Sequence, residues 1–578
     1  MAGPSILVLG FATPTVISLW SPAPGPQSWA GAAPSAGAAS LWALHSAMLS
    51  MGVTALIVSA ALTVYRWALP RRLLHGILFL ILLDVFYRVA YGGPVSPGLL
   101  HAVRTTSERE SVELLAGHPA LTASLSLAAL LACIGLKVSW STAPRLSSRR
   151  CLQLTMASLS LIAGSMALGM LSIQNARALS AAVVAEVKGV FPIDCAAAFG
   201  IVAVEALQTH RDEAKRAAFT FDDPHLRDAG ARRGASEVYV IVIGETSRRA
   251  NWSLFGYSRP TTPQLDAIKD RLVMFSRMTS NATNTVLSLP MVLTGASPDA
   301  WEVARSQKSI VALLRQAGFE TFWISNQERP ALASDPIMQI AREAEHVSFP
   351  DDLPRAPERD PFDSNLITRF DAALARLPQG AKAVFFLHME GSHFGYRERY
   401  PAESARFPDG QRPPRDLPGR QMRLVDEYDN SIYFTSQNIR SAIDRLDRCR
   451  CKAALMFFSD HGERLFDQGL RDADFGHGFP AVSAQEIAVP FFIWFSASYR
   501  ASNPQLLERL EASSRSPAQL RNLFESIVDL TGVDYGHRAA ASSLFSEDWR
   551  PPHSLQVLTL EENVITLAPE QASSQAAR

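Results

Sequence analysis

The stretch Val238–Ile243, with the sequence VYVIVI, decides the fold of the larger part of this chain. Its uninterrupted run of apolar residues is typical of a strand that is buried on both faces of a parallel sheet. Similar runs follow at residues 321–325, 383–388, 454–459 and 489–495. Amphipathic stretches between them, at residues 309–316 and 366–377, predict helices. The alternation predicts an α/β domain with a mainly parallel central sheet.

The chain before this domain is apolar and predicts a membrane region. In 578 residues, Lys plus Arg number 55 and Asp plus Glu number 55, yet the first charged side chain is Arg66. The zero net charge gives no indication of a nucleic-acid partner. A spanning helix needs roughly 20 apolar residues. Five such helices are predicted, at residues 6–20, 41–65, 73–91, 121–138 and 152–173. The alternative for the first segment is a signal peptide, but the positive n-region of such a peptide is missing.

The basic residues of the short loops predict how these helices are oriented. Arg66, Arg71 and Arg72 lie between the second and third segments, and Arg149 and Arg150 between the fourth and fifth. Because basic loops face the cytoplasm, the chain after residue 173 is expected on the outer side. We therefore expect a transmembrane domain over residues 1–175, followed by an interfacial helix and linker over residues 176–235. The α/β domain then occupies residues 236–550, and residues 551–578 form a polar tail.

Polar side chains follow three of the predicted strands at the points where the strands end. Glu245 follows the first run, His393 lies shortly after the third, and Asp460 and His461 follow the fourth. Ligands of open α/β sheets bind beyond the carboxyl ends of the strands. Carboxylate oxygens and imidazole nitrogens are the ligand types that zinc takes in catalytic sites. The sequence therefore predicts a zinc site at this edge of the sheet.

The residues at these strand ends belong to motifs that resemble a known family. The family is that of the phosphoethanolamine transferases, whose catalytic domain is similar to alkaline phosphatases and sulfatases. The motifs are residues 244–248 (GETSR), 280–285 (SNATNT), 388–393 (HMEGSH) and 459–463 (SDHGE), the last followed by His477. The resemblance covers nearly the whole chain and extends to five membrane spans before a periplasmic domain.

The resemblance implies specific roles for residues of this chain. It makes Thr283 the nucleophile. It also makes Thr283 one of four zinc ligands, with Glu245, Asp460 and His461 as the others. The resemblance also implies four substrate-binding residues: His393, His477, Asn326 and Glu110. His393 and His477 are expected to hold the phosphoryl group or a second zinc ion. A threonine hydroxyl is a poor nucleophile, and zinc coordination lowers the pKa of a bound oxygen toward neutrality. The helix-like run at residues 286–293 would also offer backbone N–H groups to a phosphate.

The implied function is the transfer of phosphoethanolamine from phosphatidylethanolamine to an acceptor in the bacterial cell envelope. The acceptor is lipopolysaccharide, at lipid A or core sugars, or a periplasmic glucan. The implied enzyme is a monomer of the inner membrane that forms a phosphothreonine intermediate. Alternatives on the same fold are a phosphoglycerol transferase, a phosphodiesterase or sulfatase-like hydrolase, and a membrane sensor that has lost its activity. A sulfatase needs Cys or Ser in a Cys/Ser-x-Pro-x-Arg setting, which the residues around Thr283 do not supply.

Some features leave alternatives open. Thr283 and Thr285 both lie near a predicted helix start, where threonine is usually a cap. Asn281 and Ala282 stand where the family often has cysteine and glycine, so the disulfide that braces this loop is missing. A disulfide between Cys195 and either Cys449 or Cys451 is an alternative to three free thiols.

Overall fold

The computed structural model describes the α/β part of the chain. Described are residues 149, 152–153, 155–163, 211–221, 226 and 236–574, except 330–334, 353–361, 409–416, 468–474, 479–480, 537 and 561. Apart from helical residues between 152 and 163, the predicted spans lie outside these residues, as do Glu110 and the predicted interfacial helix. In the described part of the chain, no helix is long and apolar enough to cross a membrane. The chain divides into two compact units, Met1–Arg104 with Leu115–Glu205 and Thr105–Leu114 with Ala206–Arg578, and the second is described below.

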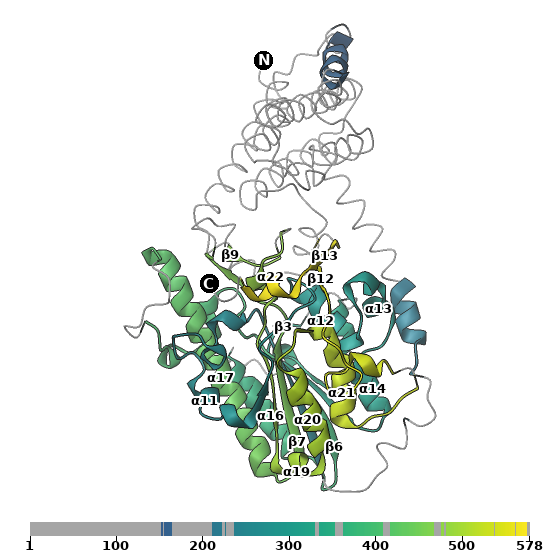
Figure 1. Cartoon of the computed structure of the whole chain (residues 1–578), viewed down its shortest axis with the longest axis vertical. Coiled ribbons are helices and arrows are strands. Elements are labelled where there is room, and N and C mark those ends of the chain that lie inside the picture. The colour runs from purple at the N-terminus through teal and green to yellow at the C-terminus, as the bar shows by residue number, and fades with distance from the viewer. Residues whose placement is uncertain are drawn as a thin grey trace. The chain divides into compact units, whose positions relative to one another are not determined.

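A seven-stranded sheet forms the centre of this unit, in the order β2-β10-β7-β1-β6-β4-β5. Helices lie on both sides of this sheet (Figure 1). The strands β7, β1, β6, β4 and β5 run parallel, while β10 pairs antiparallel with both β7 and β2. The bounds, in chain order, are β1 Glu237–Gly244, β2 Leu272–Met274, β4 Glu320–Ser325, β5 His346–Ser348, β6 Lys382–His388, β7 Lys452–Ser459 and β10 Phe491–Phe495. The predicted α/β fold with a mainly parallel sheet is thus confirmed.

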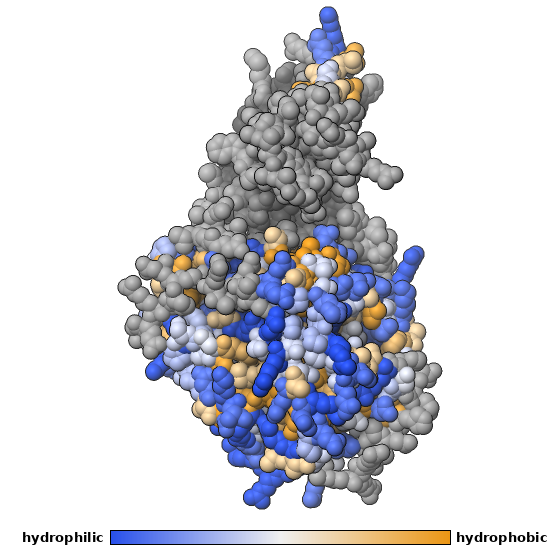
Figure 2. Space-filling model, in the orientation of Figure 1, coloured by the Kyte–Doolittle hydropathy of each residue, from blue (hydrophilic) through white to orange (hydrophobic). Residues whose placement is uncertain are grey.

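Helices cover both faces of the sheet, and this explains why the strands have no polar face. Along β1, alternate side chains enter two different cores. Val240 packs with α16 (Asp363–Leu374) and α17 (Gly419–Cys449), whereas Ile241 packs on the opposite face. That opposite face is covered by α12 Thr285–Thr294, α14 Ile310–Gln316, α20 Pro504–Ser513 and α21 Leu523–Thr531. Figure 2 shows that the described surface around these cores is mostly hydrophilic.

The predicted helices form with small shifts of their ends. The helix α14 begins at Ile310, with Ser309 as its N-cap, close to the predicted residues 309–316. The helix α16 begins at Asp363, three residues before the predicted start, and ends at Leu374. Asp363 is only 2% exposed and accepts hydrogen bonds from the backbone N–H groups of Glu390 and Gly391. This tertiary contact, which periodicity does not reveal, fixes the helix start.

The structure corrects the prediction of a polar tail after residue 551. The strands β12 (Leu555–Leu558) and β13 (Val564–Leu567) form an antiparallel hairpin, followed by α22 (Pro569–Ser574). Leu555, Val557 and Leu558 are at most 1% exposed. The stretch looks weakly patterned because each strand has only four residues. Its burial depends on partners such as Ile487, which are far away in the sequence.

The structure also settles which of the described cysteines are paired. A disulfide joins Cys449, the last residue of α17, to Cys451, whose Cα atom lies 5.3 Å away. Arg450 between them has a positive φ of 55°, which turns the chain from helix into strand β7. The alternative pairing of either cysteine with Cys195 is therefore wrong.

Candidate metal centre and active site

The ends of four neighbouring parallel strands bring the predicted ligands together. Backbone hydrogen bonds hold the strand exits: Asp460 N donates to Gly244 O (3.1 Å) and Met389 N to Ile243 O (2.9 Å). Gly391 has a φ of 55°, and a Cβ there would lie 2.8 Å from the backbone nitrogen of Glu245. A side chain at this position is therefore excluded by both backbone conformation and space. This close approach lets the loop after β6 lie directly against the end of β1.

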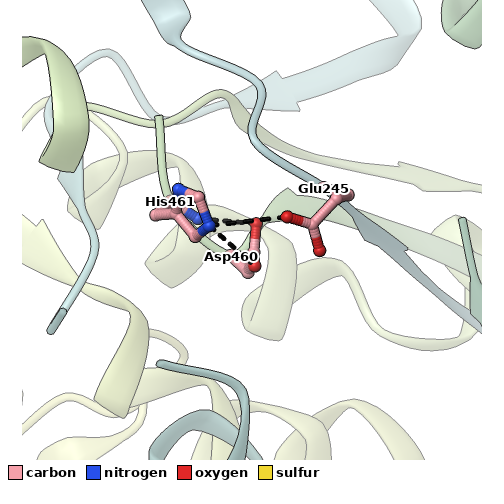
Figure 3. A group of neighbouring side chains, drawn as sticks. All are labelled: Glu245, Asp460 and His461. Atoms are coloured by element: carbon pink, nitrogen blue, oxygen red, sulfur yellow. Dashed lines mark hydrogen bonds and ion pairs between the residues drawn. The ribbon is translucent and has the colours of Figure 1, made fainter. Parts of the chain in front are cut away.

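Glu245, Asp460 and His461 form a compact cluster at this edge. One ligand atom from each lies within 4.8 Å of the other two. The His461 Nε2 atom is 3.4 Å from Glu245 Oε1 and 3.5 Å from Asp460 Oδ2, and the three side chains point toward one another (Figure 3). All three are at most 1% exposed. The structure thus brings together three of the four predicted metal ligands.

The chemistry of this cluster suits a cation. His461 Nδ1 lies 2.9 Å from the carbonyl oxygen of Gly462, so Nδ1 carries a proton and Nε2 is the ring atom that faces the two carboxylates and is available to a cation. Asp460 Oδ1 accepts hydrogen bonds from the backbone N–H groups of Thr246 and His461. Asp460 Oδ2 is buried and has no hydrogen-bond partner among the described residues. The cluster has more hydrogen-bond acceptors facing one another than protons to share between them. A metal ion bound by these acceptors would satisfy them.

The pKa values of His461, Asp460 and Glu245 also indicate that a positive charge stabilises this cluster. Burial lowers the pKa of His461, but the charges of Asp460 and Glu245 outweigh it and raise this pKa to about 10. Burial and the charge of Glu245 raise the pKa of Asp460 to about 6. Burial also raises the pKa of Glu245, yet the hydrogen bond and charge of His461 hold it well below its usual range. A proton on His461 therefore takes the place of a cation.

The threonine hydroxyl beside this cluster belongs to Thr285, which corrects the prediction of Thr283. Thr285 Oγ1 lies 3.0 and 3.1 Å from the two carboxylate oxygens of Glu245 and 3.2 Å from His461 Nε2. Thr283 is 0% exposed, and its hydroxyl has no hydrogen-bond partner among the described residues. The Thr285 hydroxyl has one proton to donate among these acceptors, so its oxygen keeps lone pairs that are available to a cation at the cluster.

The start of α12 determines which threonine faces the cluster. Asn284 is the N-cap, and its side-chain oxygen accepts a hydrogen bond from Leu287 N (3.1 Å). Thr285 is therefore the first residue of the helix, where unpaired backbone N–H groups favour an anion. The helix is anchored to the end of β7 because Ser288 Oγ donates to Asp460 O (2.7 Å). The signal in the sequence was the N-cap preference of Asn284, which lies between the two threonines.

The predicted histidines His393 and His477 both lie near the cluster. The His477 ring centroid is 4.3 Å from that of His461 and 6.5 Å from that of His393. His477 Nδ1 lies 3.2 Å from Glu463 Oε1, and Glu463 is 1% exposed. This contact holds the imidazole ring with Nδ1 toward the carboxylate of Glu463. Glu463 was part of a quoted motif, but sequence reasoning gave it no role.

The structure places Gln327, which follows the predicted donor-binding residue Asn326, in contact with the cluster. Asn326 Nδ2 donates to Asp363 (3.1 Å), and its side-chain oxygen lies 3.4 Å from Arg369. Gln327 Nε2 donates to Glu245 Oε2 (3.0 Å) and to the carbonyl oxygen of Met389 (3.0 Å). Gln327 thus ties together the ends of β4, β1 and β6. A one-residue difference after a strand reverses the direction of a side chain, and the sequence alone does not settle it.

A buried ionic network supports the segment that follows Glu245. Arg259 is 1% exposed and lies 2.7 Å from Asp426 and 2.8 Å from Asp429, both on α17. Asn251 and Tyr257 also donate hydrogen bonds to Asp429. The network fixes residues 251–259 against α17 and so stabilises the chain between Glu245 and the next helix.

Comparison with known proteins identifies the family. The model of the Sulfatase family matches residues 237–533, which are more than half of the 578 residues, so the chain belongs to this family. Among curated relatives, "Phosphoethanolamine transferase EptC" of Escherichia coli is 27% identical over 301 residues, 51% of each chain. "Kdo(2)-lipid A phosphoethanolamine 7''-transferase" of Escherichia coli is 28% identical over 316 residues, covering 52% of this chain and 53% of that protein. The chain thus spans about half the length of these relatives in the matches. The predicted resemblance to phosphoethanolamine transferases is confirmed.

Solved structures show the same fold. The periplasmic domain of EptC from Escherichia coli, in complex with Zn, has a TM-score of 0.53 at 23% identity and covers 58% of this chain and 93% of that chain. The integral membrane lipooligosaccharide phosphoethanolamine transferase A (EptA) from Neisseria meningitidis has a TM-score of 0.67 at 21% identity, covering 93% of this chain and 97% of that one.

Proposed function

We propose that this protein transfers phosphoethanolamine from phosphatidylethanolamine to an acceptor of the cell envelope through a covalent intermediate on Thr285. The observation that carries the proposal is the position of Thr285 Oγ1, within 3.2 Å of two members of a buried metal-ligand cluster and at the start of a helix. The names of the relatives support phosphoethanolamine as the transferred group.

The proposed resident metal is zinc, held by Glu245, Asp460 and His461 with the hydroxyl of Thr285. The carboxylate and imidazole ligand set fits zinc, and the complex with Zn of the related EptC domain agrees with this choice. When bound, zinc lowers the pKa of the coordinated hydroxyl and stabilises negative charge on the phosphoryl oxygens.

The proposed reaction has two displacements at phosphorus. Thr285 Oγ1 forms a bond to phosphorus while the bond to the diacylglycerol oxygen breaks, and diacylglycerol leaves with a proton. An acceptor hydroxyl or phosphate then forms the new bond, the bond to Thr285 breaks, and the acceptor's proton replaces the one that Thr285 lost. His477, held by Glu463, is the proposed proton carrier because its ring lies beside that of His461. His393 is proposed to contact the phosphoryl oxygens, and Asn326 supports this edge through Asp363.

The donor and acceptor place the protein at a membrane. We propose a monomer that is anchored by five spans in the bacterial inner membrane, with the described unit on the periplasmic side. Glu110 is proposed to bind the ammonium group of the donor. The acceptor is lipopolysaccharide or a periplasmic glucan, and the name of the 7''-transferase of Escherichia coli favours lipopolysaccharide.

A test compares the envelope of cells with and without the enzyme by mass spectrometry. The proposal predicts phosphoethanolamine added to lipopolysaccharide or glucan, and loss of this addition in the Thr285→Val variant. Addition of phosphoglycerol would show the alternative transferase, and release of phosphoethanolamine into water without a modified acceptor would show a hydrolase. Either result would overturn the proposed transfer.

A further inference from the structure

The C-terminal hairpin, residues 555–567, lies against the loop that carries the catalytic threonine. Leu558 N donates a hydrogen bond to Asn281 O (2.8 Å), and Leu558 forms a parallel β-bridge with Ala282. The Leu558 side chain is 1% exposed and packs in one apolar cluster with Ala282, Leu287 and Met291. The hairpin therefore contacts both the loop before Thr285 and the helix that begins with it.

The same loop is held from a second direction by the segment before α21. Asn281 Oδ1 accepts a hydrogen bond from Arg521 N (2.7 Å). Gln519 Nε2 donates to the carbonyl oxygen of Gln556 in β12 (2.9 Å), which links this segment to the hairpin. The residue at position 281 is asparagine, so its amide and backbone carbonyl, rather than a covalent cross-link, fix the loop at this point.

The turn of the hairpin reaches a second part of the active site. A Cβ placed on Gly478 would lie 2.9 Å from Leu560 Cδ1, so the Leu560 side chain rests on the backbone of Gly478. Gly478 directly follows His477 and has a φ of 75°. Arg305 of α13 (Trp301–Ser306) lies 3.7 Å from Glu562 in the same turn. One short segment thus touches the neighbours of both Thr285 and His477.

We propose that the C-terminal hairpin is a brace that sets the distance between the threonine loop and the His477 turn. Leu560 is the positioning residue for His477, and Leu558 is the positioning residue for the loop before Thr285. The inference rests on the proposed function in that Thr285 and His477 act on the same phosphoryl group. The hairpin makes catalysis depend on a segment in which the sequence shows no catalytic motif.

The test uses the full-length, zinc-loaded protein with Leu560→Ala, Leu560→Met and the control Thr566→Ala, which changes an exposed residue of β13. The readouts are zinc content, thermal unfolding, turnover of bis(4-nitrophenyl) phosphate and transfer from phosphatidylethanolamine vesicles. Small displacements of catalytic groups cost on the order of 10- to 100-fold in rate. The brace predicts that Leu560→Ala lowers kcat by about that factor with KM within about twofold and zinc content unchanged.

Leu560→Met, which keeps an apolar side chain of similar reach, should restore most of kcat, and Thr566→Ala should match the wild type. Wild-type kcat for Leu560→Ala would overturn the brace, as would a loss of kcat that follows only from loss of zinc or of folded protein. If the wild type turned over the phosphodiester but did not transfer from lipid, the proposed function would fail, while the phosphodiester kinetics would still test the brace.

Discussion

Gln327 offers a sharp test of how the metal ligands are oriented. Its amide donates to the Glu245 carboxylate and to the Met389 carbonyl, both at 3.0 Å. Replacement by methionine keeps the length of the side chain and removes both donors. We expect the Gln327→Met protein to fold, since Gln327 is partly exposed, and to bind zinc more weakly because the Glu245 carboxylate loses the bond that fixes its rotation.

The magnitude follows from the bond that is lost. A hydrogen bond to a charged group contributes about 1.5–3 kcal/mol. Loss of a residue that orients a metal ligand typically costs about 10- to 100-fold in metal affinity, which corresponds to about 1.4–2.8 kcal/mol. The two estimates agree, so the dissociation constant for zinc should rise by about one to two orders of magnitude.

Competition with a chromogenic chelator at pH 7.5 measures this dissociation constant. Gln339→Met is the matched control, because Gln339 also donates from its amide to a glutamate carboxylate, that of Glu213 (3.1 Å), but outside the cluster. The control should bind zinc as the wild type does. If Gln327→Met bound zinc within about twofold of the control, the assigned role of Gln327 in orienting Glu245 would be wrong.

Three further predictions concern stability and pH. Arg259→Met should lower the free energy of unfolding in urea by about 3–5 kcal/mol, since it leaves two buried carboxylates on α17 unpaired; a loss below about 1 kcal/mol would contradict the buried network. Burial raises the pKa of Asp363 to about 6, above its unfolded value of about 3.9, so this group favours the folded state below pH 4 and this gain is lost as the pH rises through 6. The difference in unfolding free energy between the wild type and Asp363→Asn should therefore change by about 3 kcal/mol between pH 4 and pH 7, and a constant difference would refute it. Zinc affinity, measured by chelator competition, should fall from pH 8 to pH 6 because protons compete for His461, and an affinity that is independent of pH would argue against this ligand.

The sheet and the core of the metal site could be predicted from the sequence. Continuous apolar runs such as that of β1 have few alternatives to a strand that is buried on both faces. Because neighbouring parallel strands end at one edge, residues directly after them, such as Glu245, Asp460 and His461, must come close together. The strand ends predicted that carboxylates and imidazoles gather at this edge, and the family resemblance was needed to select Glu245, Asp460 and His461 among them.

Which threonine faces the cluster depends on a detail that the sequence marks only weakly. Thr283 and Thr285 flank Asn284, and either could have preceded the helix. The N-cap bond from Leu287 N to Asn284 places Thr285 inside the first turn, beside Glu245, and leaves Thr283 buried behind it. A shift of two residues at a helix start is within the ordinary uncertainty of helix ends.

The C-terminal hairpin was missed for a different reason. Its apolar residues are few, and what buries them lies far away in the sequence: Ala282 for Leu558 and Ile487 for Val557. Local patterns do not report such contacts, because short strands gain their stability from the neighbours on which they pack. Gln327 was missed because the family resemblance implied a role for the preceding residue, Asn326, and none for Gln327.

The most direct test of the account is to find where the transferred group resides on the protein. Full-length protein is incubated with phosphatidylethanolamine, and intact mass and peptide mapping locate any adduct. The account predicts phosphoethanolamine on Thr285. In Thr283→Val, which replaces a buried hydroxyl without a hydrogen-bond partner among the described residues by a methyl group of similar shape, adduct and turnover should be preserved. Thr285→Val should lose both, and an adduct on Thr283 or full activity of Thr285→Val would contradict the account.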